Sequence, residues 1–151
     1  MLFFTHVAGG LLLSLFMMLF ISPDSNLIFL ILVIIGSLLP DIDCRTSKVG
    51  KNKKVHKLVE HRGIFHSILM AFLLYLLVEL QLSSNVSLGF LIGYISHILL
   101  DGMTKKGVFP FYPLKLKVKG NIKTGSLYEY MIFFASCSLA LFMIIVMRLL
   151  W

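Results

Sequence analysis

The sequence predicts an all-α fold, a polytopic membrane helix bundle of about five transmembrane helices that forms a single domain over residues 1–151. Two observations favour this class. Of the 151 residues, 58% are hydrophobic and only 14% are charged, whereas soluble domains have roughly 45–50% and about 25%. The basic residues are also confined to particular segments between apolar runs. The composition excludes a disordered chain, a disulfide-stapled secreted scaffold and most soluble globular classes.

Five apolar runs are predicted to be helices, because a bilayer core of about 30 Å needs roughly 20 mostly apolar residues. They cover approximately residues 2–21, 27–40, 64–82, 86–101 and 127–149. The first lacks a basic leading region and a small-residue cleavage site, so we expect a retained helix rather than a signal peptide. The second ends at Pro40 and the fourth is short. We expect these two to be tilted, buried or not fully spanning.

The basic residues predict the orientation of the bundle. Seven lie in the 41–63 segment and six in the 102–126 segment, together 13 of the 14 in the chain. If all five runs cross, both segments and the N-terminus share one side of the membrane. The positive-inside rule makes that side cytoplasmic and puts the C-terminus outside, in a cytoplasmic (inner) membrane. The charge of +7 then belongs to the membrane surface, and no nucleic-acid partner is expected.

The ionisable residues near the apolar runs gather at the same end. An ionisable side chain within a membrane helix costs about 2.5–3.5 kcal/mol on insertion scales, so such residues indicate a function. Each of the five predicted helices contributes at least one at the cytoplasmic level. They are His6, Asp41, Asp43, His61, His66, His97, Asp101 and Glu129. Their convergence does not depend on the predicted orientation.

Single motifs are compatible with ordinary structural roles as well. His97 and Asp101 are four residues apart, so they share one helix face and can bind one ion, or else they are a helix-end histidine and a capping acid. Asp41 and Asp43 follow a helix end, where acidic turn residues are common. Glu129 can simply be an acid that interacts with the dipole at a helix N-terminus.

The segment His61-Arg62-Gly63-Ile64-Phe65-His66 carries two histidines that a continuous helix would place about 140° apart. Both can serve one site only if the helix begins near Gly63 and leaves His61 in the loop. Arg62 is a candidate to bind a phosphate or carboxylate. The alternative is a capping segment with surface histidines, and an isolated His6 would usually make an interhelical hydrogen bond.

Together these residues predict a metal site. Three or four histidines and three or four carboxylates at one depth need neutralisation, and apparent metal-binding energies of about 10–16 kcal/mol exceed the insertion costs. A proton relay or channel would instead spread its ionisable groups through the membrane. The mixed nitrogen and oxygen donors suit a divalent metal such as Zn, with Mn or Fe as alternatives. The set exceeds the needs of one four-coordinate ion, so two or more ions are expected.

Three motifs carry a resemblance to a known family. They are Leu39-Pro40-Asp41-Ile42-Asp43, His61-Arg62-Gly63-x-x-His66-Ser67 and Gly93-Tyr94-x-Ser96-His97-x-Leu99-Leu100-Asp101. With His6 near the start, they resemble the YdjM-like family of LexA-regulated inner-membrane proteins regarded as metal-dependent hydrolases. The order of ligands is also similar, more remotely, to the zinc-dependent phospholipase C and P1 nuclease superfamily. Cys44 stands where the family often has histidine, so it is either a softer ligand or no ligand.

The resemblance implies a membrane-bound metal-dependent hydrolase whose substrate is an anionic or phosphate-containing membrane lipid, cleaved at a phosphoester by metal-activated water. Asp43 is then the candidate general base, and Arg62 the candidate for binding the anionic group. The expected metal ligands are His6, Asp41, His61, His66, His97, Asp101 and Glu129. Two alternatives stay open: a non-catalytic membrane protein with a structural metal site, and a small metal transporter. The sequence does not fix the oligomeric state.

Overall fold

The computed structural model describes residues 1–41 and 64–150, and within them the fold is entirely helical. The two short 3₁₀ helices are η1 (Leu39–Asp41), which follows the second α-helix, and η3 (Ile64–His66), which precedes the third. The five α-helices are α1 (Phe3–Met17), α2 (Asn26–Leu38), α4 (Ile68–Glu79), α5 (Ser84–Gly102) and α6 (Leu127–Leu150). Isolated bridges such as Val108 with Val118 occur, but the described residues form no strand. The predicted all-α class and the order of five helices are confirmed.

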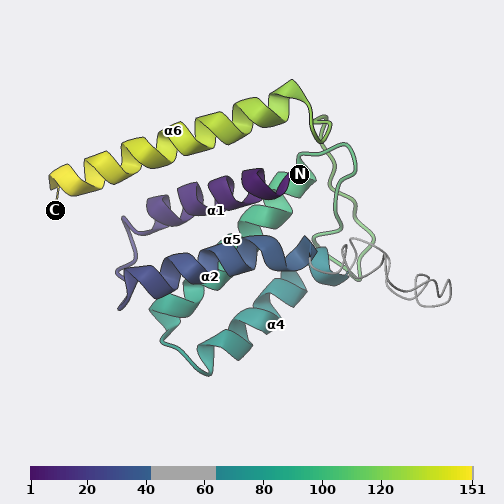
Figure 1. Ribbon diagram of the computed structural model, residues 1–151. Helices are drawn as coiled ribbons and strands as arrows, with labels where there is room; N and C mark the ends of the chain where they lie inside the picture. Colours follow the sequence, from purple (N-terminus) through teal and green to yellow (C-terminus); the bar gives the residue numbers. More distant parts are fainter. Residues whose placement is uncertain (42–63, 151) are drawn as a thin grey trace.

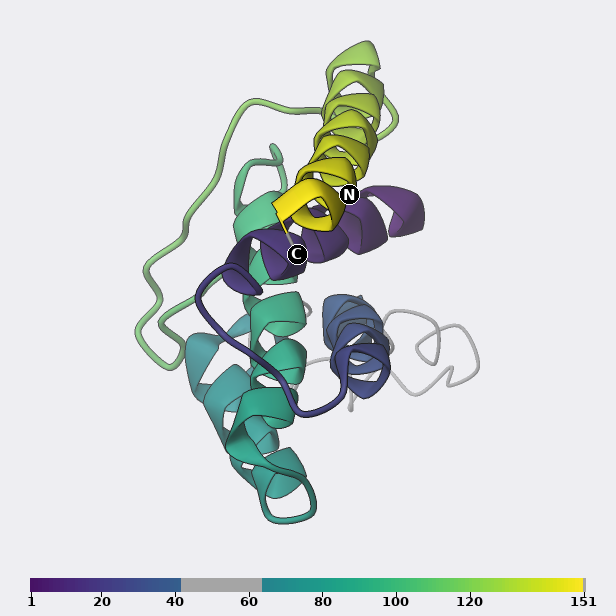
Figure 2. The same cartoon turned by 90° about the vertical axis from the view of Figure 1, so that its left-hand side faces the viewer.

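The five helices alternate in direction, so the connections lie at two opposite ends of the bundle (Figure 1). The N-terminus, the end of α2, the start of α4, the end of α5 and the start of α6 lie at one end. We call this the site end. Helix α5 packs against α1, α2 and α4, whereas α6 packs on α1 (Figures 1 and 2). Helix α5 is therefore the central element.

Glycines allow α2 and α5 to approach backbone to backbone. A Cβ atom added to Gly36 of α2 would lie 2.2 Å from the Phe90 carbonyl oxygen. A Cβ added to Gly93 of α5 would lie 2.1 Å from the Val33 carbonyl oxygen. Small residues at a helix–helix contact permit such close packing, which is common between membrane helices. This contact fixes the end of α2 relative to the end of α5.

Helices α1, α2 and α4 are shorter than the predicted spans, whereas α5 and α6 are slightly longer. Among the described residues, one segment, Leu127–Leu149, is long and apolar enough to cross a membrane, and the apolar helices α1, α2 and α4 have 17 or fewer residues. Helix α4 begins at Ile68 rather than at residue 64, because η3 and the N-cap Ser67 take up the preceding residues. Five crossings are thus not confirmed by the helix lengths.

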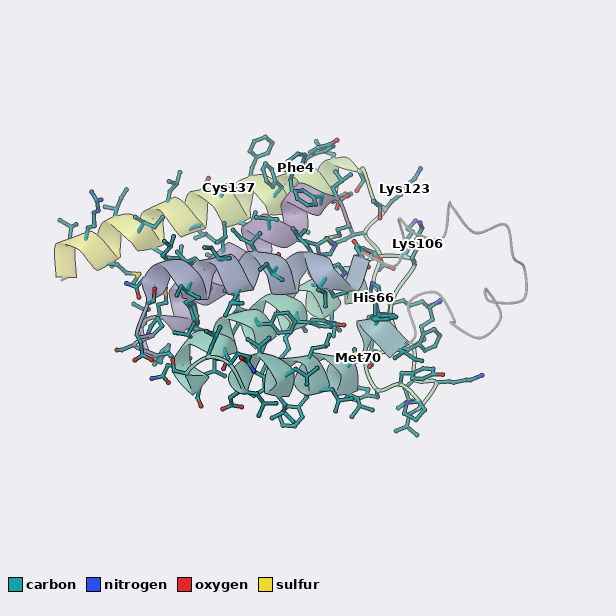
Figure 3. All side chains as sticks on the ribbon, turned by 60° about the horizontal axis from the view of Figure 1, so that its bottom comes forward. Phe4, His66, Met70, Lys106, Lys123 and Cys137 are labelled. Atoms are coloured by element: carbon teal, nitrogen blue, oxygen red, sulfur yellow. The ribbon has the colours of Figure 1, made fainter. Side chains whose placement is uncertain are left out.

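The connection from Met103 to Ser126 wraps the site end of α5. Lys105 N–H donates to the Ile122 carbonyl, and Val108 and Val118 exchange two backbone hydrogen bonds of 2.9 Å each. Val108 is buried, whereas the lysine side chains of this connection are exposed. These are Lys105, Lys106, Lys115, Lys117, Lys119 and Lys123. The connection that carries these six lysines lies at the site end (Figure 1), where Figure 3 labels Lys106 and Lys123.

Candidate metal centre

Two histidines and two aspartates from three parts of the chain converge at the site end. Asp41 ends η1, His66 ends η3, and His97 and Asp101 lie in the last two turns of α5. Each offers one ligand atom, and the four atoms all lie within 4.8 Å of one another. Figure 3 shows His66 at this end of the bundle, beside the connection that carries Lys106. The structure therefore brings together four of the seven predicted metal ligands in one group.

The distances within the group suit a shared ion better than hydrogen bonds. His66 Nε2 lies 3.6 Å from Asp41 Oδ1 and 3.8 Å from Asp101 Oδ2. His97 Nε2 lies 3.8 Å and 4.0 Å from the same two oxygens. Tetrahedral ligands at about 2.0–2.2 Å from zinc are about 3.3–3.6 Å apart. The four nitrogen–oxygen distances thus equal or exceed this spacing by a few tenths of an ångström, and all pairs lie within 4.8 Å.

The imidazole of His97 is oriented by the end of α2. Its Nδ1 lies 2.8 Å from the Ser37 carbonyl oxygen. A carbonyl can only accept, so Nδ1 carries the proton and Nε2 presents its lone pair to the group. A backbone acceptor on the distal nitrogen is a common way of orienting a metal-binding histidine. The α2–α5 contact at Gly36 and Gly93 brings Ser37 to this position.

His66 is held by hydrogen bonds of the turn that contains it. The Tyr94 hydroxyl, fully buried in α5, donates to the Phe65 carbonyl at 2.5 Å. Ser67 caps α4 by accepting from the Met70 N–H, and its hydroxyl donates to the Ile64 carbonyl. These contacts fix the backbone on both sides of His66.

The burial of the imidazoles supports a ligand role. His66 and His97 are fully buried, and neither His66 nitrogen nor His97 Nε2 has a hydrogen-bond partner within residues 1–41 and 64–150. A buried polar atom without a partner costs roughly 1–3 kcal/mol, so such atoms are rare unless an ion or water satisfies them. The residues present therefore fit a divalent cation with two nitrogen and two oxygen donors.

Asp41 gives the group access to the surface. Its side chain is 36% exposed, whereas those of His66, His97 and Asp101 are fully buried. Burial alone would raise the pKa of the Asp41 carboxyl. The neighbouring imidazoles of His66, His97 and His6 outweigh this effect and lower the pKa to about 2. Asp41 is therefore ionised at neutral pH and is suited to bind a cation.

His6 lies on the other side of the same two carboxylates. Its Nε2 is 3.4 Å from Asp101 Oδ1 and 4.0 Å from Asp41 Oδ2. The ring stacks on His97 with a centroid separation of 3.8 Å and an interplanar angle of 12°. The Met1 amino group also contacts Asp101 Oδ1. His6 thus adjoins the four-residue group, as the sequence predicts.

Glu129 is not in this group. Although fully buried, its carboxylate accepts from the Leu2 N–H at 2.5 Å and from the Gly125 N–H at 2.6 Å. These bonds tie the start of α6 to the start of α1. Glu129 thus anchors α6 to α1. No contact with the four-residue group supports its predicted role as a metal ligand.

Three predicted site residues, Asp43, His61 and Arg62, lie outside the described residues, as does Cys44. Their roles stay predictions. Of the hydroxyls near the ligands, Ser96 donates to the Gly93 carbonyl and Thr104 to the Asp101 carbonyl. Both hydrogen bonds are to backbone atoms rather than to ligand side chains.

Comparison with known proteins now places the chain in a family. The family model described as YdjM inner membrane protein matches residues 1–151. The chain belongs to the YdjM family. A Bacillus subtilis protein named YvsG and described as uncharacterized is 31% identical over 106 residues, which are 65% of this chain and 66% of YvsG. The inner membrane protein YdjM of Escherichia coli is 32% identical over 97 residues, 57% of this chain and 50% of that protein.

The aligned parts thus span about half to two thirds of the length of these curated relatives. No solved structure gives a significant match. The predicted likeness to the YdjM family is confirmed, whereas that to the P1 nuclease superfamily has no support from the comparisons.

Sequence reasoning missed the residues that orient the ligands. The Ser37 carbonyl holds His97, and the Tyr94 hydroxyl holds the turn of His66. A backbone acceptor leaves no signal in a sequence. The glycines of the α2–α5 contact do leave a signal, because Gly89 and Gly93 are four residues apart in an apolar helix. This spacing is typical of helices that pack closely in membranes.

Proposed function

We propose that this YdjM-family protein is a membrane-embedded metal-dependent hydrolase that cleaves a phosphoester of a lipid at the cytoplasmic membrane surface. The observation that carries the proposal is the buried group of Asp41, His66, His97 and Asp101, whose imidazole nitrogens face two carboxylates. A divalent ion bound there, Zn²⁺ by preference or Mn²⁺ or Fe²⁺, supplies Lewis acidity that activates water and stabilises phosphoryl oxygens.

The distribution of polar and apolar side chains supports a membrane location. The interior contains fully buried His6, His66, His97 and Asp101, whereas large apolar side chains cover the outside of α4 and α6. Examples are Leu77, 61% exposed, and Phe134, 64% exposed. Water would disfavour this arrangement, while lipid would favour it. We propose five membrane-embedded helices, with the shorter ones accommodated by tilt or local thinning of the bilayer.

The position of the group supports a lipid substrate. The six exposed lysines of the 102–126 segment lie at the same end, and each basic residue near an anionic surface contributes about 1 kcal/mol of attraction. This end is cytoplasmic under the positive-inside rule. A lipid headgroup can approach Asp41 from the interface while its acyl chains stay beside the exposed apolar faces.

The proposed roles divide between described and undescribed residues. Asp41, His66, His97 and Asp101 hold the ion, and the Ser37 carbonyl keeps the lone pair of His97 directed at it. Asp43 accepts a proton from the attacking water, and Arg62 binds the phosphate of the substrate. His61 adds a further ligand from the same segment.

The test combines metal content with turnover. The purified full chain, reconstituted in vesicles of phosphatidylglycerol and phosphatidylethanolamine, is assayed for release of phosphate or of a phosphorylated alcohol. His97→Ala is expected to lose the bound metal and the activity. The matched control is Ser87→Ala, which changes a buried side chain of the same helix whose hydroxyl donates to the Ser84 carbonyl. It is expected to retain both.

Three results contradict the proposal. Wild-type protein without bound metal excludes the metal centre itself. Bound metal that raises the melting temperature without turnover of any phospholipid favours a structural metal site. Metal flux across the vesicle membrane that is lost in His97→Ala favours a small metal transporter.

A further inference from the structure

Asp41 and Asp101 each present one oxygen to the described group and the other oxygen to His6. Asp41 Oδ1 and Asp101 Oδ2 face His66 and His97, at 3.6 to 4.0 Å. Asp41 Oδ2 and Asp101 Oδ1 face His6 Nε2, at 4.0 and 3.4 Å. Asp101 Oδ1 also contacts the Met1 amino group. Both carboxylates thus lie between His66 and His97 on one side and His6 on the other.

We propose that a second divalent ion binds between His6 Nε2, Asp41 Oδ2 and Asp101 Oδ1, bridged to the first ion by the two carboxylates. The proposal rests on the metal centre of the proposed function, but it does not require hydrolase activity. Carboxylates that use both oxygens commonly bridge two ions about 3.5–4 Å apart. Such a pair matches the donors present on both sides of Asp41 and Asp101.

The state of His6 is the independent observation. The side chain is fully buried, and neither of its ring nitrogens has a hydrogen-bond partner in the part of the chain that the structure describes. The usual alternative, an interhelical hydrogen bond, is therefore not what holds this imidazole. Its Nε2 is directed at two carboxylate oxygens, as a ligand would be.

The ring of His6 is aligned with the ring of His97. The two rings stack with a centroid separation of 3.8 Å and an interplanar angle of 12°, and His97 Nδ1 is bound to the Ser37 carbonyl. Both rings therefore present Nε2 to the carboxylates of Asp41 and Asp101. Parallel rings in this arrangement suit two neighbouring ions.

His6 is also fixed to the centre by packing. Gly10, one turn after His6 in α1, lies against α2 and α5, since an added Cβ would be 3.2 Å from Ser37 Cβ and 3.3 Å from Ser96 Oγ. Helix α1 is therefore held close to α5, which carries Asp101, and to α2, which leads directly into η1 and Asp41. The proposed second site uses α1, η1 and α5, whereas the first uses η1, η3 and α5.

The experiment counts the ions in the full chain, purified in detergent, loaded with Mn²⁺ and freed of excess metal. Wild-type protein is expected to hold about two Mn²⁺ per chain, with the multiline EPR signal of a spin-coupled pair. His6→Ala is expected to hold about one, with the six-line signal of an isolated Mn²⁺. His6→Gln, which fills more of the space, repeats the test if His6→Ala does not fold.

The matched control is Ser14→Ala, which changes another buried polar residue of α1, more than two turns from His6. It is expected to keep two ions and the coupled signal. One ion in the wild type, two ions in a folded His6 variant, or none in a folded His6 variant each overturns the second site. Wild-type protein with no bound metal instead overturns the metal centre of the proposed function.

Discussion

Helices α5 and α6 are both long, but their surroundings are opposite. Helix α5 has 19 residues and contributes more than half of them to the buried interior, including His97 and Asp101. Helix α6 has 24 residues and exposes most of its large apolar side chains, such as Phe142 and Leu149. The more polar of the two helices is therefore the more buried.

The difference shows what determines burial in this chain. In a soluble protein the hydrophobic effect would bury the apolar face of α6. Within a bilayer, helices associate through close packing and polar contacts, because lipid is as apolar as leucine. Helix α5 has the glycines and polar side chains that such contacts need, and α6 offers them mainly at its first turn, through Glu129.

The largest expected difference between the two helices concerns their buried acids. Asp101 of α5 and Glu129 of α6 are both fully buried at the site end, but only Asp101 lies in the metal group. We predict that Asp101→Asn lowers bound metal to background, because Zn²⁺ is bound by carboxylate oxygen, imidazole nitrogen and thiolate sulfur rather than by a neutral amide. Glu129→Gln is expected to keep the wild-type content. Elemental analysis of the purified chain measures both.

Two results would refute this contrast between Asp101 and Glu129. Loss of metal from a folded Glu129→Gln protein would restore the predicted ligand role of Glu129. Retention of full metal content in Asp101→Asn would remove α5 from the metal centre.

The second prediction concerns added volume. Gly93→Ala puts a methyl group 2.1 Å from the Val33 carbonyl oxygen. Because this oxygen belongs to the backbone, the clash can be relieved only if α2 moves away from α5. We expect destabilisation of about 2–3 kcal/mol, or a fall in melting temperature of about 4–12 °C. The control Ala135→Leu adds more volume on an exposed position of α6 and is expected to shift the midpoint little. An unchanged midpoint for Gly93→Ala would contradict the close contact of α2 and α5.

The third prediction concerns the anchoring role of Glu129. In the wild type, both carboxylate oxygens of Glu129 accept from a backbone N–H group. In Glu129→Gln an NH₂ group replaces one of these oxygens, so one backbone N–H loses its acceptor. Hydrogen bonds to charged groups contribute about 1.5–3 kcal/mol, and we expect a loss of about 2 kcal/mol. Thermal unfolding in detergent measures it. Glu79→Gln is the control, because Glu79 accepts from Ser84 in an exposed pair; equal effects of the two changes would argue against the anchor.

The sequence predicted the helices and their common end because these depend on local patterns. Apolar runs predicted five helices in the observed order, and the ionisable residues at the run ends were predicted to meet as one set of eight. Of that set, Asp41, His66, His97 and Asp101 form the group and His6 adjoins it, whereas Glu129 lies apart and Asp43 and His61 lie outside the described residues. The ends of the helices were less predictable. Apolar residues such as Ile64 occur in 3₁₀ turns as well as in α-helices, so the apolar pattern does not separate η3 from α4. The start of α4 was therefore predicted four residues too early.

Side-chain partners could not be predicted in the same way. Glu129 and Asp101 occupy similar positions in the sequence pattern, at helix ends that both lie at the site end. Their roles differ because Leu2 and Gly125 present backbone N–H groups to Glu129. The contact with Leu2 joins chain segments 127 residues apart, and the sequence pattern contains no information on their distance in space.

The smallest expected effect tests how α5 positions His66. Tyr94→Phe removes the hydroxyl that donates to the Phe65 carbonyl and leaves the packing of the ring nearly unchanged. A neutral hydrogen bond contributes about 1 kcal/mol, so a looser turn at His66 should weaken metal binding about fivefold. Tyr128→Phe, on an exposed position of α6, is expected to leave the affinity unchanged. Competition with a metal-binding dye measures the affinities. Equal affinity of Tyr94→Phe and wild-type protein would mean that Ser67 and the start of α4 are sufficient to hold His66, and that α5 contributes to the centre only through its two ligands.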